Sequence, residues 1–92
     1  MRVSVYATLR AAVGQKTVEV AHADGAPVRE LVATLVEQHA ALAPLILDGD
    51  GSLLRSVHVY VNGRSAVHLP GRLDTPLREG DVIDLIPAVA GG

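Results

Sequence analysis

The chemistry that this sequence offers is concentrated at its carboxyl end, where the chain closes with Gly91 and Gly92. Average glycine usage of about 7% would place such a pair there by chance in about 0.5% of chains. Glycines lack a Cβ atom and can thread a narrow channel in conformations closed to other residues. A terminal carboxylate, with an ordinary pKa of about 3.5, is ionised at neutral pH and can attack an activated phosphate. We therefore expect Gly92 to be the reactive residue and Gly91 and Ala90 to enter a partner's active site.

Other arrangements of polar residues do not complete a site. Asp48 and Asp50 resemble the start of a calcium loop, but Leu53 and Val59 stand where that loop needs Gly and Glu. The Gly49-Asp50-Gly51 segment lacks the third glycine of a dinucleotide-binding turn, and no GxSxG nucleophile motif is present. The four histidines form no i, i+4 pair and no HxH motif: His22, His39, His58 and His68. We expect no metal site, no bound cofactor and no catalytic activity from this chain alone.

Composition narrows the class of protein further. The 92 residues suit one domain, and an apolar content of 49% excludes disorder of the charged, apolar-poor kind. A net charge of −2 and only two aromatic residues, Tyr6 and Tyr60, argue against a nucleic-acid-binding surface. The absence of cysteine excludes disulfides, thiolate metal sites and a cysteine nucleophile. No stretch resembles a secretory signal or a membrane span, so we expect a cytoplasmic protein without membrane or nucleic-acid partners.

Apolar and polar residues alternate in several segments of the chain. This pattern predicts the strands of the domain that carries the tail. Apolar and polar residues alternate most clearly over Val57–Val61, and Asn62-Gly63 directly after this run predicts a type I′ hairpin turn. The segment before it, Asp48 to Ser52, is predicted to be a turn. The predicted strands cover residues 2–8, 16–21, 57–61, 64–67 and 82–86, with a loop around Gly14 between the first two.

One segment has helical periodicity instead. From Val28 the apolar residues follow the i, i+3, i+4, i+7, i+8 stripe, and Pro27 suits a first helical position. The helix is predicted to end before Pro44 and to cover the sheet with Val28, Leu31, Val32, Leu35 and Val36. The most economical architecture is an α+β roll, one mixed sheet covered by one main helix, over residues 1–87. Residues 88–92 are predicted to be a flexible tail.

Several segments together resemble the MoaD/ThiS family of ubiquitin-like β-grasp sulfur carriers over essentially the whole chain. The most specific is the ending, in which Gly80-Asp81, a strand and Pro87 precede the terminal glycines. The segments that carry the resemblance are Val5–Arg10 with Gly14, Pro27–Leu31, Val59–Arg64, Pro76–Asp81 and Ile86–Gly92. The ending and the Val-Tyr-Val-Asn hairpin look closer to CysO-like carriers, and archaeal-type small modifiers share similar endings.

The resemblance implies a β-grasp fold and a function for the tail. An ATP-dependent adenylating enzyme of the MoeB/ThiF type would activate the Gly92 carboxylate, and a sulfur donor would convert it to a thiocarboxylate. The sulfur would then pass to a synthase, either the large subunit of molybdopterin synthase or a cysteine-synthase-like enzyme. The alternative is a ubiquitin-like modifier that is joined through Gly92 to lysines of other proteins.

The last predicted strand also indicates where partners would bind. If Ile83 and Leu85 pack under the helix, then Val82, Asp84 and Ile86 lie on the opposite face of the sheet. Tyr60 and His58 lie on the corresponding face of their strand. Apolar side chains there could form a docking surface, although single exposed apolar residues are common on any protein surface. We expect partner contacts from Tyr60, Val82, Ile86 and, in the tail, Val89.

Overall fold

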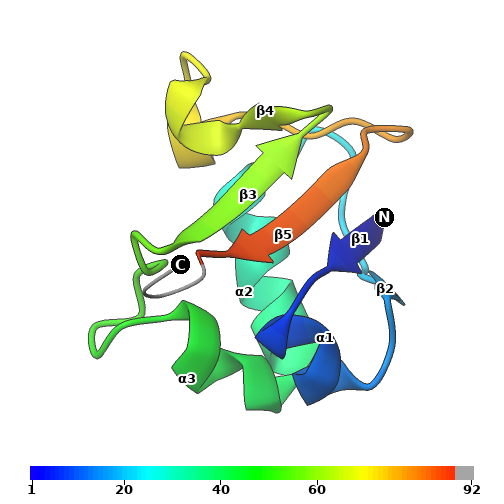
Figure 1. Ribbon diagram of the computed structural model, residues 1–92. Helices are drawn as coiled ribbons and strands as arrows, with labels where there is room; N and C mark the ends of the chain where they lie inside the picture. Colours follow the sequence, from blue (N-terminus) through cyan, green and yellow to red (C-terminus); the bar gives the residue numbers. More distant parts are fainter. Residues whose placement is uncertain (89–92) are drawn as a thin grey trace.

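The computed structural model describes residues 1–88 and places the helices on one face of a mixed five-stranded sheet (Figure 1). The strand order is β2-β1-β5-β3-β4. β1 and β5 are parallel, and every other neighbouring pair is antiparallel. The strands are β1 (Arg2–Val5), β2 (Thr17–Glu19), β3 (Val57–Val61), β4 (Arg64–Ser65) and β5 (Ile83–Pro87). The predicted α+β, ubiquitin-like β-grasp architecture is confirmed.

The main helix, α2 (Val28–Gln38), packs its apolar stripe against the sheet. Its buried residues are Val28, Leu31, Val32 and Leu35, while Val36 is partly buried at the edge of the same core. The sheet contributes the residues expected from the alternation, namely Val3, Val5, Val57, Val59, Val61, Ile83 and Leu85. No side chain caps the first turn of α2. Pro27 is the N-cap residue, with extended backbone angles, rather than the first helical residue.

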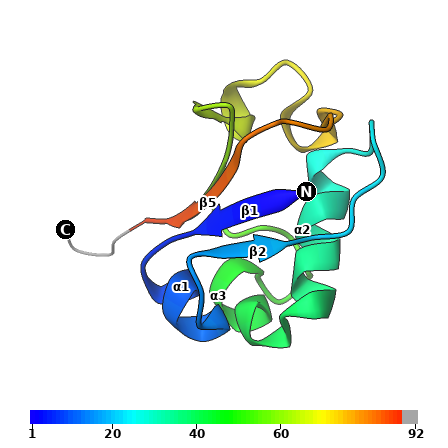
Figure 2. The same ribbon diagram turned by 90° about the vertical axis from the view of Figure 1, so that its right-hand side faces the viewer.

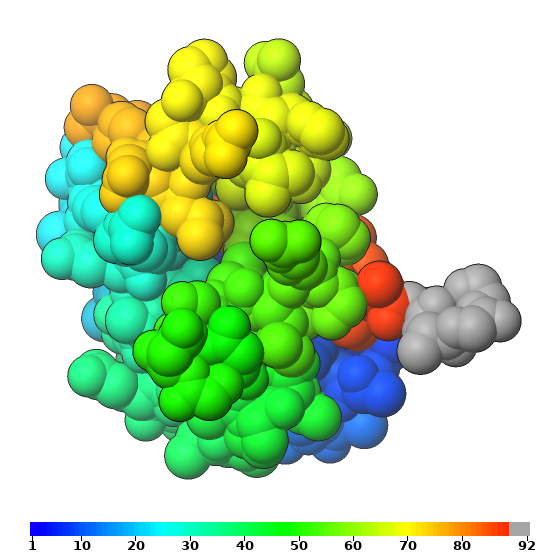
Figure 3. All heavy atoms as spheres, turned by 90° about the vertical axis from the view of Figure 1, so that its left-hand side faces the viewer, coloured from blue at the N-terminus to red at the C-terminus, as the bar shows by residue number. Residues whose placement is uncertain are grey.

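Two short helices complete the helical layer, and the sequence did not predict either. α1 (Thr8–Val13) occupies most of the expected loop before Gly14 and buries Leu9 completely. α3 (Ala43–Ile46) contains Pro44 in its first turn and buries Ile46. Figure 3 shows the flank of the molecule where residues 43–54 (green) lie below the 66–74 segment (yellow), which contains two 3-10 helices, Ala66–His68 and Arg72–Asp74. A six-residue and a four-residue helix are too short for a 3.6-residue period to stand out.

Strand ends differ from the prediction where the chain must turn. The first strand ends at Val5 instead of residue 8 because the chain enters α1. The second strand is confined to Thr17–Glu19, and β4 ends at Ser65 where a 3-10 helix begins. The last strand begins one residue later than predicted and includes Pro87, whose Cα pairs with that of Val57. Proline is tolerated at that place because it stands at the end of the strand.

The Asn62-Gly63 hairpin is confirmed and also holds β5. Both residues have positive φ, 52° and 82°, as a type I′ turn requires. The Asn62 side chain accepts a hydrogen bond from the Val82 N–H at 2.8 Å and donates one to Asp81 at 3.1 Å. Asp81 also accepts from the Arg78 N–H at 2.7 Å, and these two hydrogen bonds, the Arg78 one first, lower the pKa of its carboxyl. The hairpin therefore fixes the start of the strand that ends in the tail.

Replacing Ala7 by Gly is expected to raise the free energy of unfolding by about 1 kcal/mol. Ala7 has φ 52° and ψ −126°, and the Leu9 N–H donates to the Tyr6 carbonyl at 3.1 Å, which together describe a type II′ turn. The first central position of a type II′ turn normally holds glycine. Glycine gives the unfolded chain more conformational freedom, which lowers stability by about 0.5–1 kcal/mol. The relief of backbone strain in the folded state should exceed this loss. Urea unfolding of A7G checks the prediction, and a lower midpoint than wild type would contradict it.

Candidate functional site

The carboxyl end of β5 is held by hydrogen bonds up to the point where the tail begins. The Ala88 N–H donates to the Ser56 carbonyl, one residue beyond the Val57–Pro87 pair. β1 runs parallel to β5, with Val5 opposite Leu85, so the two strands end together at one end of the sheet (Figure 2). The predicted tail residues Val89, Ala90, Gly91 and Gly92 lie outside the described residues. Their expected roles, and the domain boundary at residue 87, therefore stay predictions.

The sheet face opposite the helices, which we call the outer face, has half-buried aromatic and apolar side chains. The register pairs His58 of β3 with Ile86 of β5, and Tyr60 with Asp84. All four of these side chains are half-buried, whereas Ile83 and Leu85 are each 1% exposed on the helix side. The His58 and Tyr60 rings lie 6.3 Å apart, tilted by 58°. The predicted assignment of the two faces of the last strand is thus confirmed.

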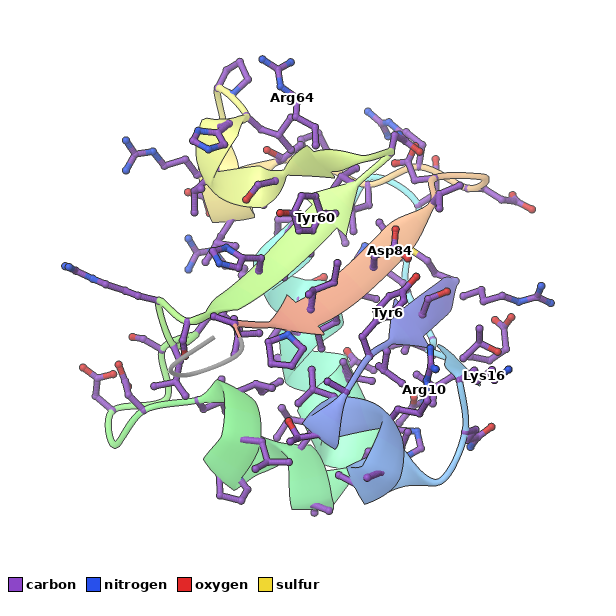
Figure 4. The ribbon with its side chains drawn as sticks, in the orientation of Figure 1. Tyr6, Arg10, Lys16, Tyr60, Arg64 and Asp84 are labelled. Atoms are coloured by element: carbon purple, nitrogen blue, oxygen red, sulfur yellow. The ribbon has the colours of Figure 1, made fainter. Side chains whose placement is uncertain are left out.

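A polar cluster lies beside this surface, on the β1 side of β5 (Figure 4). The Tyr6 hydroxyl donates a hydrogen bond to the Asp84 carboxylate at 2.9 Å. That hydrogen bond, together with the carboxylate's charge, raises the pKa of the Tyr6 phenol, so the hydroxyl remains a donor near neutral pH. The Arg10 guanidinium lies 5.3 Å from the centre of the Tyr6 ring and donates to the Val5 carbonyl at 3.1 Å. Asp84 therefore holds the hydroxyl of Tyr6, and Arg10 packs on its ring.

The predicted partner-binding residues are not all close together. Ile86 lies next to the base of the tail, in the same cross-strand row as His58, and Tyr60 is in the neighbouring row. Val82 is 58% exposed but precedes β5, beside the Asn62 turn. With a strand rise of about 3.3 Å per residue, Val82 is about 13 Å from Ile86. The structure thus groups Ile86, Tyr60 and His58 and places Val82 at the far end of β5.

The sequence reasoning did not select the Tyr6, Asp84 and Arg10 cluster as part of a site. The alternation of the last strand did place Asp84 on the outer face, which was one available signal. Its partner could not be named, because the parallel pairing of β1 with β5 joins residues 78 positions apart. Within residues 1–88 no cluster of three or more His, Cys, Asp or Glu side chains could hold a metal ion. No helix in this same part of the chain is long and apolar enough to cross a membrane.

Comparison with known proteins decides the family. The model of the ThiS family matches residues 3–92. The chain belongs to the ThiS family. Among its relatives, small archaeal modifier protein 3 of Haloferax volcanii is 38% identical over 87 residues, covering 95% of this chain and 92% of the relative. The sulfur carrier protein CysO of Mycobacterium tuberculosis is 33% identical over 81 residues, covering 86% of this chain and 83% of CysO.

Solved structures agree with the ThiS-family assignment. The crystal structure of SAMP1 from Haloferax volcanii aligns with a TM-score of 0.88 and 32% identity, covering 100% of this chain and 98% of that one. CysO in the BexX/CysO complex of Amycolatopsis orientalis aligns with a TM-score of 0.79 and 33% identity, covering 99% and 98%. The resemblance to MoaD/ThiS carriers and their CysO-like members is confirmed. This ThiS-family chain is therefore a small ubiquitin-like protein whose relatives carry sulfur or modify proteins.

Proposed function

We propose that this protein is a sulfur carrier whose sulfur is attached to the carboxyl group of Gly92. The observation that carries the proposal is the ThiS-family match, which extends through residue 92 and so includes both terminal glycines. Relatives named as sulfur carriers support it. The described part of the chain contributes a stable domain and a fixed tail base rather than reacting groups.

Activation is assigned to a partner that binds ATP, because the sequence contains no complete dinucleotide-binding glycine motif. A carboxylate oxygen of Gly92 attacks the α-phosphorus of ATP, pyrophosphate leaves, and an acyl-adenylate forms. A sulfur donor then attacks the carbonyl carbon, AMP leaves, and the product is a thiocarboxylate. We assign the first step to an adenylating enzyme of the MoeB/ThiF type, in keeping with the family.

The sulfur acceptor is a second partner. We propose a synthase that makes molybdopterin, cysteine or another thio-metabolite, either the large subunit of molybdopterin synthase or a cysteine-synthase-like enzyme. The similarity to CysO of Mycobacterium tuberculosis favours the cysteine route. The crystallised complex of a CysO with BexX shows that a carrier of this fold docks onto another protein. We propose that this chain docks onto a partner enzyme as well.

The oxygen-to-sulfur exchange provides the test. The protein is incubated with an adenylating enzyme of confirmed activity, ATP and a sulfur donor, and its intact mass is measured. We expect the mass to increase by the difference between one sulfur and one oxygen, with the change located in the peptide that contains Gly92. An unchanged mass under these conditions would refute the carrier proposal.

Similarity to small archaeal modifier protein 3 supports a second candidate, a ubiquitin-like modifier. The carrier and the modifier share the adenylation step and differ in the nucleophile that follows. Denaturing gels of cells that express the tagged protein distinguish them. A ladder of adducts that requires Gly92 favours the modifier, and thiocarboxylate without such a ladder favours the carrier.

The outer face is proposed to dock onto the adenylating enzyme through Ile86 and Tyr60. Ile86→Asp is expected to weaken that binding at least tenfold, which corresponds to about 1.4 kcal/mol, because a charge would enter an apolar contact beside the tail. The unfolding temperature should change little, since Ile86 is only half-buried. Val67→Asp is the matched control, because Val67 is 55% exposed on a 3-10 helix away from β5. Equal affinity of I86D and wild type would remove this surface from the mechanism.

A further inference from the structure

Arg10 combines partial burial with the lack of an acidic partner. Residues 1–88 contain every arginine of the chain, and among them only Arg10 is half-buried, while the others are exposed. Arg2, Arg29 and Arg78 form ion pairs with carboxylates. Within the same residues no carboxylate lies at ion-pair distance from Arg10. A partly buried charge without a counterion loses hydration that nothing replaces in full, so an anion that binds Arg10 would recover interaction energy.

Two contacts hold the Arg10 guanidinium in place. Its Nε donates to the Val5 carbonyl at 3.1 Å, and its central carbon lies 5.3 Å from the centre of the Tyr6 ring. The Tyr6 hydroxyl donates to the Asp84 carboxylate at 2.9 Å, so the carboxylate of this cluster is already occupied by Tyr6. The two terminal nitrogens of Arg10 have no hydrogen-bond acceptor within residues 1–88. Because the side chain is already ordered, it loses little entropy when these nitrogens bind a partner.

The contact with Val5 places Arg10 beside the strand that ends in the tail. Val5 pairs with Leu85 of β5. A spacing of about 4.8 Å between strands and about 3.3 Å per residue puts the Val5 Cα about 8 Å from that of Pro87. The Val5 N–H donates to the Lys16 carbonyl at 2.9 Å, which brings a second, exposed cation to the same strand end (Figure 4). A protein that receives the tail therefore passes close to both cations.

We propose that Arg10 recognises a carboxylate of the adenylating enzyme beside the channel that receives the tail. The inference rests on the proposed function, which supplies that enzyme. A carboxylate accepts two parallel N–H bonds from an arginine, and Arg10 offers its two terminal nitrogens for this geometry. Lys16 adds positive charge without a fixed geometry. Arg10 thus determines specificity: it favours enzymes with an acidic side chain at this place and disfavours those with a basic one.

Binding of the full chain to an adenylating enzyme of confirmed activity, measured by calorimetric titration at low and at high salt, tests the proposal. Arg10→Ala should weaken binding at least tenfold, which corresponds to about 1.4 kcal/mol, and the difference should shrink at high salt because ions screen the pair. Arg10→Lys should bind with an affinity between those of wild type and Arg10→Ala, because it keeps the charge and loses the two parallel hydrogen bonds. Equal affinities of Arg10→Ala and wild type would overturn the proposal.

Arg64→Ala is the matched control for these measurements. Arg64 is exposed in β4 and has no carboxylate at ion-pair distance within residues 1–88. It pairs with Val61, which pairs in turn with Ile83, so it lies at the end of β5 away from the tail. Arg64→Ala should therefore bind as tightly as wild type. An equal loss of affinity in Arg64→Ala and Arg10→Ala would show a general effect of net charge and would contradict recognition by Arg10.

A zero-length cross-link identifies the chemical group that faces Arg10. Arg10→Lys places a primary amine at this position, and a carbodiimide joins an amine to a carboxylate only where the two are in contact. In the complex with the adenylating enzyme we expect a branched peptide that joins position 10 to an aspartate or glutamate of the enzyme. Arg64→Lys should give no such peptide from position 64. Cross-links from position 64 and none from position 10 would refute the assignment.

Sulfur loading at increasing carrier concentration separates this inference from the proposed function. Exchange in the wild type supports the proposed function, and Arg10→Ala should then have a KM at least tenfold higher, with the loss in KM rather than in kcat. An unchanged KM in a variant with the wild-type unfolding temperature would overturn the role of Arg10 alone. Failure of the wild type to exchange oxygen for sulfur would refute the proposed function, and the binding and cross-linking results would still decide whether Arg10 faces a carboxylate.

Discussion

Removal of Gly92 is expected to abolish thiocarboxylate formation while leaving the unfolding curve unchanged. Under the proposed function the adenylating enzyme receives a carboxylate at the end of a two-glycine segment, and the shortened chain ends one residue too early and on a single glycine. Folding should be unaffected because Gly92 lies well beyond Pro87, the last strand residue. The measurement is intact mass after incubation with enzyme, ATP and sulfur donor, alongside urea unfolding of both chains.

A second substitution separates the shape of the terminal residue from the presence of a carboxylate. Gly92→Ala keeps the chain length and the carboxylate but adds a methyl group that a narrow channel would exclude. We expect oxygen-to-sulfur exchange in G92A to be measurable but slower than in the wild type. Exchange at the wild-type rate in the chain without Gly92 would show that the reactive group lies elsewhere.

Replacing Leu35 by Ala is expected to lower the free energy of unfolding by about 2–5 kcal/mol, a large share of the 5–15 kcal/mol typical of small domains. Leu35 is 1% exposed and lies in the stripe with which α2 covers the sheet. Truncation would leave a cavity between the two layers, which the neighbouring valines and leucines can fill only in part.

The matched control for this core substitution is Leu45→Ala in α3. Leu45 is 38% exposed, so its truncation should cost less than about 1 kcal/mol. Urea or thermal unfolding of the two variants provides the comparison. Similar decreases in the free energy of unfolding of L35A and L45A would contradict the burial of the α2 stripe against the sheet.

The sequence predicts this fold well where one face of an element is buried and the other is solvated. Alternation identified the regions of β1, β2 and β3, and the apolar stripe from Val28 identified α2, because burial of one face imposes the period on the residue types. The hairpin turn placed β4 after β3, and turn residues and Pro87 bounded β5. The Asn62-Gly63 turn was predictable because few other pairs accept two positive φ values. The ending of the chain, with Gly80-Asp81, a strand and Pro87 before the two glycines, carried the most specific part of the resemblance to the family.

The features that the sequence did not reveal depend on contacts between distant segments. Leu9, Ile46 and Leu42, the last in the 3-10 helix Ala40–Leu42, complete the core from helical segments too short to show a 3.6-residue period. The sequence therefore does not reveal which apolar residues of these segments are buried. The strained turn at Ala7 is invisible because alanine gives no sign of a positive φ. The hydrogen bond between Tyr6 and Asp84 exists only because the first and last strands are parallel neighbours.

The central position of β5 has a consequence for how the protein is made. Among the five strands of residues 1–88, β5 is synthesised after the other four, yet it joins β1 to β3 and contributes Ile83 and Leu85 to the core. A nascent chain shorter than about 87 residues therefore lacks the strand that unites the sheet, and the sheet cannot form until β5 has been synthesised. Chains that stop before β5 would be left with exposed β1 and β3 edges, which makes them substrates for proteases.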